Sequence, residues 1–169
     1  MPGKAGLLAV ILPACILTAH AQRTGTTTLV LQVGPEARLV PNQVALNFRV
    51  SADGSSDVTS QTANIEAWVR ALPGQAIRVT ARVSSLNGPA GPLPATALRW
   101  SGSIERAAAG GQAASCSAGS FADGAAQDLV LGWRQSGIVG CTFTFELAAP
   151  RKLAPGSYSA VVDLAVEKR

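Results

Sequence analysis

The stretch "LAPGSYSAVVDLAVEKR", residues 153–169, decides the fold class. After a turn at Pro155 and Gly156, apolar residues occupy every second position, at Tyr158, Ala160, Val162, Leu164 and Val166. Because successive side chains of a strand point to opposite faces, this spacing predicts a β-strand with one buried face. The opposite face also carries apolar residues, at Val161 and Ala165. We therefore expect an interior strand, paired on both sides, rather than a solvated edge.

The same two-residue period recurs along the chain, while helical spacing is nearly absent. It predicts strands within residues 26–33, 43–51, 62–70, 76–86, 97–104, 128–133 and 138–148. Turn sequences such as "ADGSSD" and "LPGQ" separate these segments. The prolines of residues 86–95 are incompatible with a central strand, and "ERAAAGGQAA", residues 105–114, is predicted to be a loop. Eight or nine short strands without intervening amphipathic helices predict an all-β fold, an antiparallel immunoglobulin-like β-sandwich.

Residues 1–21 are predicted to be a secretory signal peptide. Lys4 precedes an apolar stretch, and Ala19 and Ala21 form a small-x-small cleavage site. Cleavage would leave a single domain, residues 22–169, with no stable membrane span. In the alternative, "LPAC" resembles a lipobox in which Cys15 is lipidated and anchors the protein. We favour cleavage after Ala21, which predicts an exported protein in the periplasm, at the cell surface or in the medium.

Cleavage after Ala21 would leave two cysteines, Cys116 and Cys141. In an oxidising compartment two such thiols are expected to pair, so we predict a Cys116–Cys141 disulfide. A metal site is the weaker interpretation, because two thiols without histidine or CxxC spacing do not provide four zinc ligands.

Composition argues against several classes of function. The 14 basic residues are scattered rather than clustered, and no aromatic-basic motif accompanies them, so we predict no nucleic-acid binding. The single histidine, His20, lies in the predicted signal peptide, which removes histidine-dependent nucleophilic catalysis from the mature chain. We therefore predict a protein that is not an enzyme and that uses no cofactor.

The acidic pair Asp53 and Asp57 in "ADGSSD" leaves two interpretations open. Carboxylate and carbonyl oxygens in such a loop could bind calcium loosely. An Asp-Gly pair is equally typical of a hairpin turn. We favour the turn and predict no metal.

The candidate contact surface lies on the strand predicted at residues 62–70. Alternation places Trp68 on the face opposite Ile65 and Val69, together with Asn64, Glu66 and Arg70. An aromatic plate among polar side chains suits a sugar platform or a partner hot spot. We favour the second interpretation, in which a loop such as residues 86–95 covers this face and Trp68 belongs to a satellite core. Trp100 and Trp133 are expected to cap the sandwich core.

The element Pro155-Gly156-x-Tyr158 resembles one that is common in immunoglobulin-like and fimbrial-type sandwich domains of exported bacterial proteins. In those domains the tyrosine hydroxyl ties a corner of the sandwich. The wider layout is distantly similar to the spore coat protein U and fimbrial subunit families.

Three functions follow as expectations. The first is an exported, non-catalytic module that contacts a protein or cell-surface partner. The second is a pilus-like or coat-like subunit that self-associates by donating a strand, residues 22–33, to its neighbour. The third is a carbohydrate-binding module that uses an exposed tryptophan.

Overall fold

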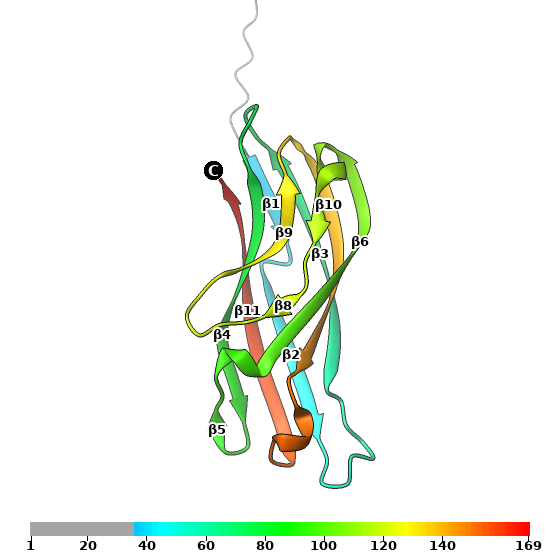
Figure 1. Ribbon diagram of the computed structural model, residues 1–169, viewed down its shortest axis with the longest axis vertical. Helices are drawn as coiled ribbons and strands as arrows, with labels where there is room; N and C mark the ends of the chain where they lie inside the picture. Colours follow the sequence, from blue (N-terminus) through cyan, green and yellow to red (C-terminus); the bar gives the residue numbers. More distant parts are fainter. Residues whose placement is uncertain (1–35) are drawn as a thin grey trace, which may run out of the picture. The chain divides into compact units, whose positions relative to one another are not determined.

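The alternating apolar residues form the strands of two antiparallel sheets that pack face to face (Figure 1). The computed structural model describes residues 36–169. The predicted signal peptide, the lipobox at Cys15, the strand predicted at residues 26–33 and the donor segment 22–33 lie outside the described residues. The part that is described contains no helix long and apolar enough to cross a membrane.

The first sheet, called here the β3 sheet, carries the candidate contact surface. Its strands, in spatial order, are β1 (Glu36–Val40), β3 (Ser60–Arg70), β10 (Gly137–Leu147), β6 (Leu98–Ala109) and β8 (Gly119–Ser120).

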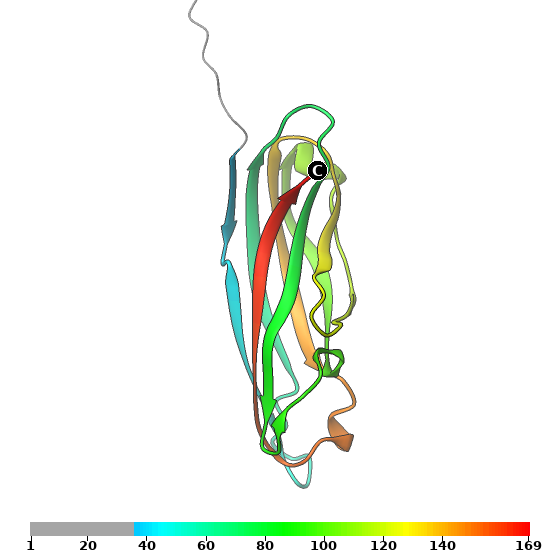
Figure 2. The same cartoon turned by 90° about the vertical axis from the view of Figure 1, so that its left-hand side faces the viewer.

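The second sheet, called here the β11 sheet, is centred on the C-terminal strand and its neighbour. Figure 2 shows β4 and β11 side by side across its front. Its strands, in spatial order, are β2 (Gln43–Val50), β11 (Gly156–Lys168), β4 (Ile77–Gly88), β9 (Gln127–Trp133) and β7 (Ser115–Cys116), and β5 (Gly91–Pro92) pairs with β4. Three short 3₁₀ turns connect strands, at Ala95–Ala97, Gly110–Ala113 and Pro150–Lys152.

The core lies between the sheets and contains the apolar faces that the sequence predicts. On β10, Val139, Cys141, Phe143, Phe145 and Leu147 are all buried. Each fully buried side chain of this size contributes about 1.5–3 kcal/mol of transfer free energy. Trp100 and Trp133 are also buried in the core, as expected.

The C-terminal strand β11 is an interior strand, which confirms the expectation from its two apolar faces. It pairs with β2 from Gly156 to Asp163 and with β4 from Ser159 to Lys168. The Tyr158 hydroxyl donates a hydrogen bond to the Ala154 carbonyl at 2.6 Å, so it ties the turn that enters the strand.

Cys116 and Cys141 form a disulfide, as predicted. Cys116 lies on β7 of the β11 sheet and Cys141 on β10 of the β3 sheet, so the bond connects the two layers. Because it closes a loop with a sequence separation of 25 residues, it restricts the unfolded chain and stabilises the fold by roughly 3 kcal/mol.

The strand count differs from the expected eight or nine, because residues 36–169 form 11 strands. The sequence pattern missed β1 and three two-residue strands, β5, β7 and β8. The predicted loop 105–114 is also wrong in its first half, because β6 continues to Ala109. β10 runs alongside it there, and a register shift between Gly140 and Cys141 accommodates Glu105 as the extra residue.

The "ADGSSD" segment connects strands of different sheets instead of forming a simple hairpin. β2 belongs to the β11 sheet and β3 to the β3 sheet, and one isolated bridge, Arg49 to Val58, joins the two arms of the connection.

Candidate functional site

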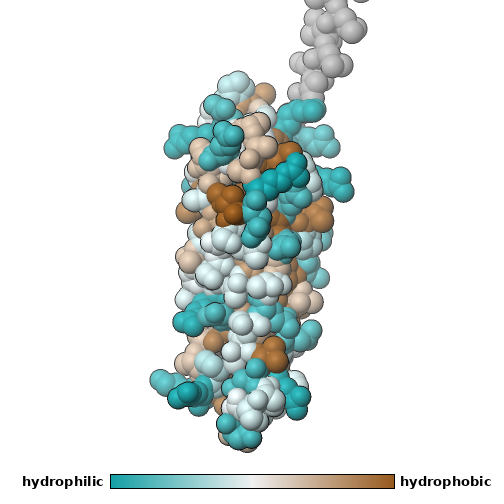
Figure 3. Space-filling view, turned by 90° about the vertical axis from the view of Figure 1, so that its right-hand side faces the viewer, coloured by the Kyte–Doolittle hydropathy of each residue, from teal (hydrophilic) through white to brown (hydrophobic). Residues whose placement is uncertain are grey.

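The outer face of the β3 sheet carries the four residues that the sequence singles out. Ile65, Ala67 and Val69 of β3 are buried in the core, so the alternate residues face outward. These outward residues are Asn64, Glu66, Trp68 and Arg70. Figure 3 views this side of the molecule, where hydrophobic residues form separate brown spots among hydrophilic ones.

Trp68 lies between two outward neighbours on adjacent strands. Its cross-strand partners are Arg38 on β1 and Ile138 on β10. The guanidinium carbon of Arg38 lies 5.4 Å from the centre of the Trp68 ring, which is the geometry of a cation–π contact. Trp68 is half-buried. Its ring is therefore held in place by its neighbours while part of its surface stays accessible.

At the next outward-facing position, the middle strand carries a glycine, so no side chain projects from the sheet there. Gly140 on β10 pairs with Glu66 on β3 and with Arg106 on β6. An Arg106 guanidinium nitrogen, Nη1, lies 3.2 Å from Glu66 Oε1, so the two side chains form an ion pair across the position of Gly140. Because Gly140 has no side chain, the two charged groups meet over the middle strand and form the floor of a depression.

The depression is a groove of about 520 Å³, called here the Trp68 groove. Asn64 and Thr142 border it, and the Thr142 hydroxyl donates a hydrogen bond to Asn64 Oδ1 at 2.8 Å. Its remaining lining comes from Val40, Pro41, Ile65, Glu66, Trp68, Glu105, Arg106, Gly140 and Cys141.

A second hollow of about 290 Å³ shares Trp68 with the groove. We call it the Arg70 hollow, and Glu36, Arg38 and Arg70 contribute its charged lining. Trp68 therefore borders two depressions on one face. Together the two depressions carry three glutamates and three arginines, so their formal charges balance.

The structure brings three of the four predicted residues to one site. Asn64, Glu66 and Trp68 line the groove, and Arg70 lines the neighbouring hollow. The favoured interpretation, in which residues 86–95 cover Trp68, is wrong for this loop, because none of these residues lines the Trp68 groove. Gly88–Leu93 line a separate pocket with Tyr158.

Sequence reasoning missed the residues that other strands contribute. Arg38, Val40, Arg106, Gly140 and Thr142 come from β1, β6 and β10. Each meets β3 only through strand pairing, and strand register is not encoded in a local pattern. Gly140 left one local signal, because it interrupts the outward face of a strand that is otherwise rich in threonine and phenylalanine.

Asp53 and Asp57 act within their own loop. Asp53 accepts hydrogen bonds from the Ser55 amide at 3.0 Å and its hydroxyl at 2.8 Å. Asp57 accepts bonds from the Ser51 amide at 2.6 Å and its hydroxyl at 2.8 Å. The backbone bonds, followed by the hydroxyl bonds, lower the pKa of each carboxyl below its usual value of 3.8. These bonds fold the segment into a compact turn, although it joins the two sheets and is not the predicted hairpin.

Within residues 36–169, no group of three or more histidine, cysteine, aspartate or glutamate side chains is placed to hold a metal ion.

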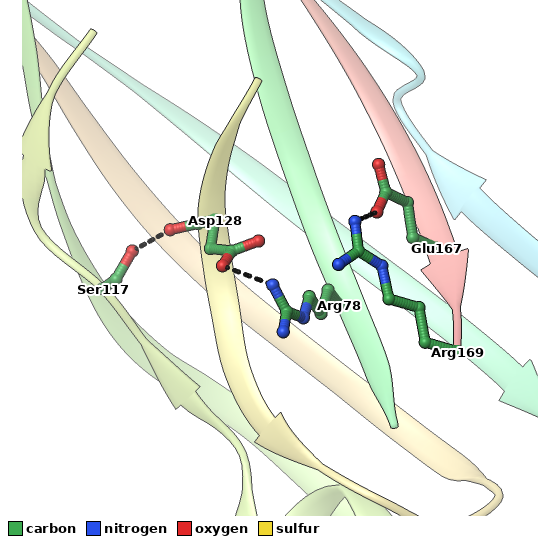
Figure 4. Close-up of polar contacts among 5 residues, drawn as sticks. All are labelled: Arg78, Ser117, Asp128, Glu167 and Arg169. Carbon is green, nitrogen blue, oxygen red and sulfur yellow. Dashed lines mark hydrogen bonds and ion pairs between the residues drawn. The ribbon is translucent and has the colours of Figure 1, made fainter. Parts of the chain in front are cut away.

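Polar contacts on the opposite sheet are of a simpler kind (Figure 4). Arg78 on β4 pairs with Asp128 on β9 at 3.1 Å, and Glu167 pairs with Arg169 at 3.2 Å. The Ser117 hydroxyl donates to the Asp128 carbonyl oxygen. These ion pairs are partly exposed, where such pairs contribute about 0–1 kcal/mol each. The Arg78–Asp128 pair links the neighbouring strands β4 and β9, whereas Glu167 and Arg169 lie two residues apart at the end of the chain.

The protein is thus a β-sandwich whose β3 sheet carries, on its outer face, a groove lined by apolar, polar and charged side chains. Comparison with protein-family models gave no match for this chain, and comparison with curated proteins gave none of significance.

Proposed function

We propose that this protein is an exported, non-catalytic, immunoglobulin-like module that binds a partner through the outer face of the β3 sheet. The observation that carries the proposal is the Trp68 groove, where a half-buried tryptophan borders a floor made by an ion pair. Sites that bind ligands are concave and combine aromatic surface with a few placed polar groups. The inter-sheet disulfide supports export, because such bonds persist in oxidising compartments.

The chemistry of the groove supports binding rather than catalysis. Its cationic side chain, Arg106, is already paired with Glu66, and residues 36–169 contain no histidine, the side chain most often used as a general base. The resemblance of the Pro155-to-Tyr158 element to exported sandwich domains supports the same class of function. The Tyr158 hydroxyl bond to Ala154 is the contact that the resemblance implies.

The test is the binding of fluorescently labelled, processed protein to intact cells of the producing organism. Trp68→Ala should abolish most of the binding, because it removes the aromatic wall of the groove. Arg82→Ala is the matched control, since Arg82 is exposed on β4 of the other sheet. Equal binding by wild type and Trp68→Ala, with both folded by circular dichroism, would exclude the β3 sheet as the contact face.

A strand-exchanging subunit is the second candidate, and one observation favours it. β11 pairs with β2 as far as Asp163, and the Leu164 amide donates one further bond to the Asn42 carbonyl at 2.9 Å, so the edge of β11 from residue 165 to residue 168 has no partner in β2. A free strand edge is where an extended segment from another chain can add.

The neighbouring edge of β2 weighs against this candidate. The Asn47 amide donates to Gln61 Oε1 at 3.0 Å, and Arg49 exchanges two backbone bonds with Val58. Both contacts occupy groups that an added strand would need.

Deletion of residues 22–33 separates the two candidates. If this segment belongs to its own closed domain, the deletion should destabilise or unfold the protein. If the segment is a donor strand, the shortened chain should remain folded and should bind the synthetic 22–33 peptide in trans. Native mass spectrometry and circular dichroism measure both outcomes.

A further inference from the structure

We propose that the ligand of the Trp68 groove is a neutral glycan, with one pyranose ring packed against Trp68. This inference rests on the proposed function, because it names the chemical class of the partner that the same face binds. Three features of this face carry it: an aromatic wall held by its neighbours, a hydrogen-bonding floor centred on an ion pair, and charges that balance over the groove and the adjoining Arg70 hollow.

The aromatic wall is held in place before any ligand arrives. Arg38 packs against the Trp68 ring at 5.4 Å, and Ile138 is its cross-strand neighbour on the other side. A sugar ring presents C–H groups on its faces, and an amphipathic indole packs against such surfaces at little cost in side-chain entropy. Because Arg38 lies over one face of the ring, we place the sugar ring against the part of Trp68 that borders the groove.

The floor offers hydrogen bonds in the number that a hydroxylated ligand requires. The Glu66–Arg106 pair uses one carboxylate oxygen and one guanidinium nitrogen, at 3.2 Å. The other Glu66 oxygen accepts further bonds and the remaining Arg106 N–H groups donate them. The Asn64 amide nitrogen donates as well, because the Thr142 hydroxyl engages only Asn64 Oδ1. Donors and acceptors thus lie beside the aromatic wall.

The charges favour a neutral ligand. Glu36, Glu66 and Glu105 are balanced by Arg38, Arg70 and Arg106 in the two depressions that border Trp68. The groove alone carries two glutamates and one arginine, and the Arg70 hollow beside it carries two arginines and one glutamate. Taken together they give no electrostatic preference to an acidic or a basic polymer.

The composition of the floor disfavours a protein hot spot. Hot spots are dry centres where large side chains fill pockets. Here the centre is an ion pair over Gly140, and an apolar side chain placed on it would remove the pair from water without replacing its hydrogen bonds. Glycan hydroxyls replace those bonds directly.

The experiment titrates the full, processed chain with three neutral probes: chitohexaose, cellohexaose and dextran. Calorimetry measures affinity and tryptophan fluorescence reports the site. Trp100 and Trp133 are only 6% and 1% exposed, so a spectral change on binding reports Trp68. We expect saturable binding to at least one probe, with an affinity that falls about tenfold or more in Trp68→Ala. Trp68→Phe should retain part of it.

Two controls distinguish the groove from simple aromatic exposure. The double variant Trp68→Ala/Arg82→Trp restores one exposed tryptophan, but on the other sheet, and should not regain binding. Heparin, a polyanion, should bind the wild type no more tightly than it binds the Trp68→Ala variant. Recovery of glycan binding in the double variant, or undiminished binding in Trp68→Ala, would overturn the proposal.

The outcome also separates this inference from the proposed function. If none of the three probes binds the folded wild type, but Trp68→Ala still loses binding to cells, the glycan proposal fails and the contact module stands. If Trp68→Ala binds cells as well as wild type does, the proposed function itself fails. Release of reducing ends from a bound probe would instead contradict the non-catalytic assignment.

Discussion

Arg106 on β6 and Glu66 on β3 form an ion pair at 3.2 Å across Gly140, although one strand, β10, lies between their own strands. In a sheet, side chains that face each other on paired strands are in contact. Side chains on the two outer strands of a group of three are normally separated by the side chain of the middle strand. The absence of that side chain allows the contact. The groove floor therefore depends on one glycine and on the register of three strands.

Gly140→Ala should leave the protein folded and raise its stability slightly. An added Cβ would lie 3.5 Å from Arg106 Cβ and 3.8 Å from Glu66 Cγ, which are ordinary contacts. The backbone there is not left-handed, so alanine should add about 0.4–1 kcal/mol to the free energy of unfolding by restricting the unfolded chain. Urea denaturation measures this change.

Gly137→Ala is the matched control on the same strand. Its Cβ would lie 2.6 Å from the Ala108 carbonyl oxygen and 2.6 Å from the Gly111 nitrogen, both backbone atoms. We expect a loss of about 1–3 kcal/mol or more. Similar midpoints for the two variants would contradict the assigned register of β10.

Tyr158→Phe should lower the free energy of unfolding by about 0.5–1.5 kcal/mol, because it removes the hydroxyl bond to the Ala154 carbonyl while keeping the buried ring. Ser159→Ala is the control. Ser159 is the exposed neighbour on β11, where a substitution should change stability by no more than about 0.5 kcal/mol. Equal midpoints for both variants in urea would show that the corner bond does not stabilise the fold.

The double variant Cys116→Ser/Cys141→Ser should lose roughly 3 kcal/mol, since the unfolded chain regains the freedom of a loop with a sequence separation of 25 residues. Denaturation of wild type with a reducing agent should give the same loss. Intact mass of the untreated protein provides the direct check. Two thiols that react with an alkylating agent before reduction would refute the bond.

The hydrogen bonds that the Asp53 and Asp57 carboxylates accept within their loop should be lost in acid. Both carboxyls have pKa values below 3.8, chiefly because Ser55 and Ser51 backbone amides, respectively, bind the charged forms. A lowered folded-state pKa means that the stabilisation is present above pH 3.8 and is lost as the pH falls through the folded value. Carboxyl NMR titrations should give midpoints below 3.8 for both groups.

Asp57→Asn supplies the control for this titration. The asparagine oxygen can still accept the Ser51 amide bond, but it does not titrate, so the acid-induced change at the Ser51 amide should disappear. Midpoints at or above 3.8 in wild type would contradict the hydrogen bonds of the loop.

The sequence by itself determined the class of fold, several strands and one face of the site. Period-2 burial is a local property, because each residue of a strand points to the face opposite its neighbour. It therefore placed Phe143 and Phe145 in the core and Trp68 outside it, and it predicted that β11 is paired on both sides. The pairing of Cys116 with Cys141 followed from their number and the expected compartment.

Only the tertiary structure decided which strands lie side by side. This pairing brings together the residues that line the groove. Arg38, Arg106 and Gly140 reach Glu66 and Trp68 through cross-strand register, which depends on pairings between segments far apart in the sequence. β1 carries little buried surface and gave no alternating signal. The extension of β6 through residues 105–109 depended on β10 as its partner, because alanine and glutamate carry weak strand propensity of their own.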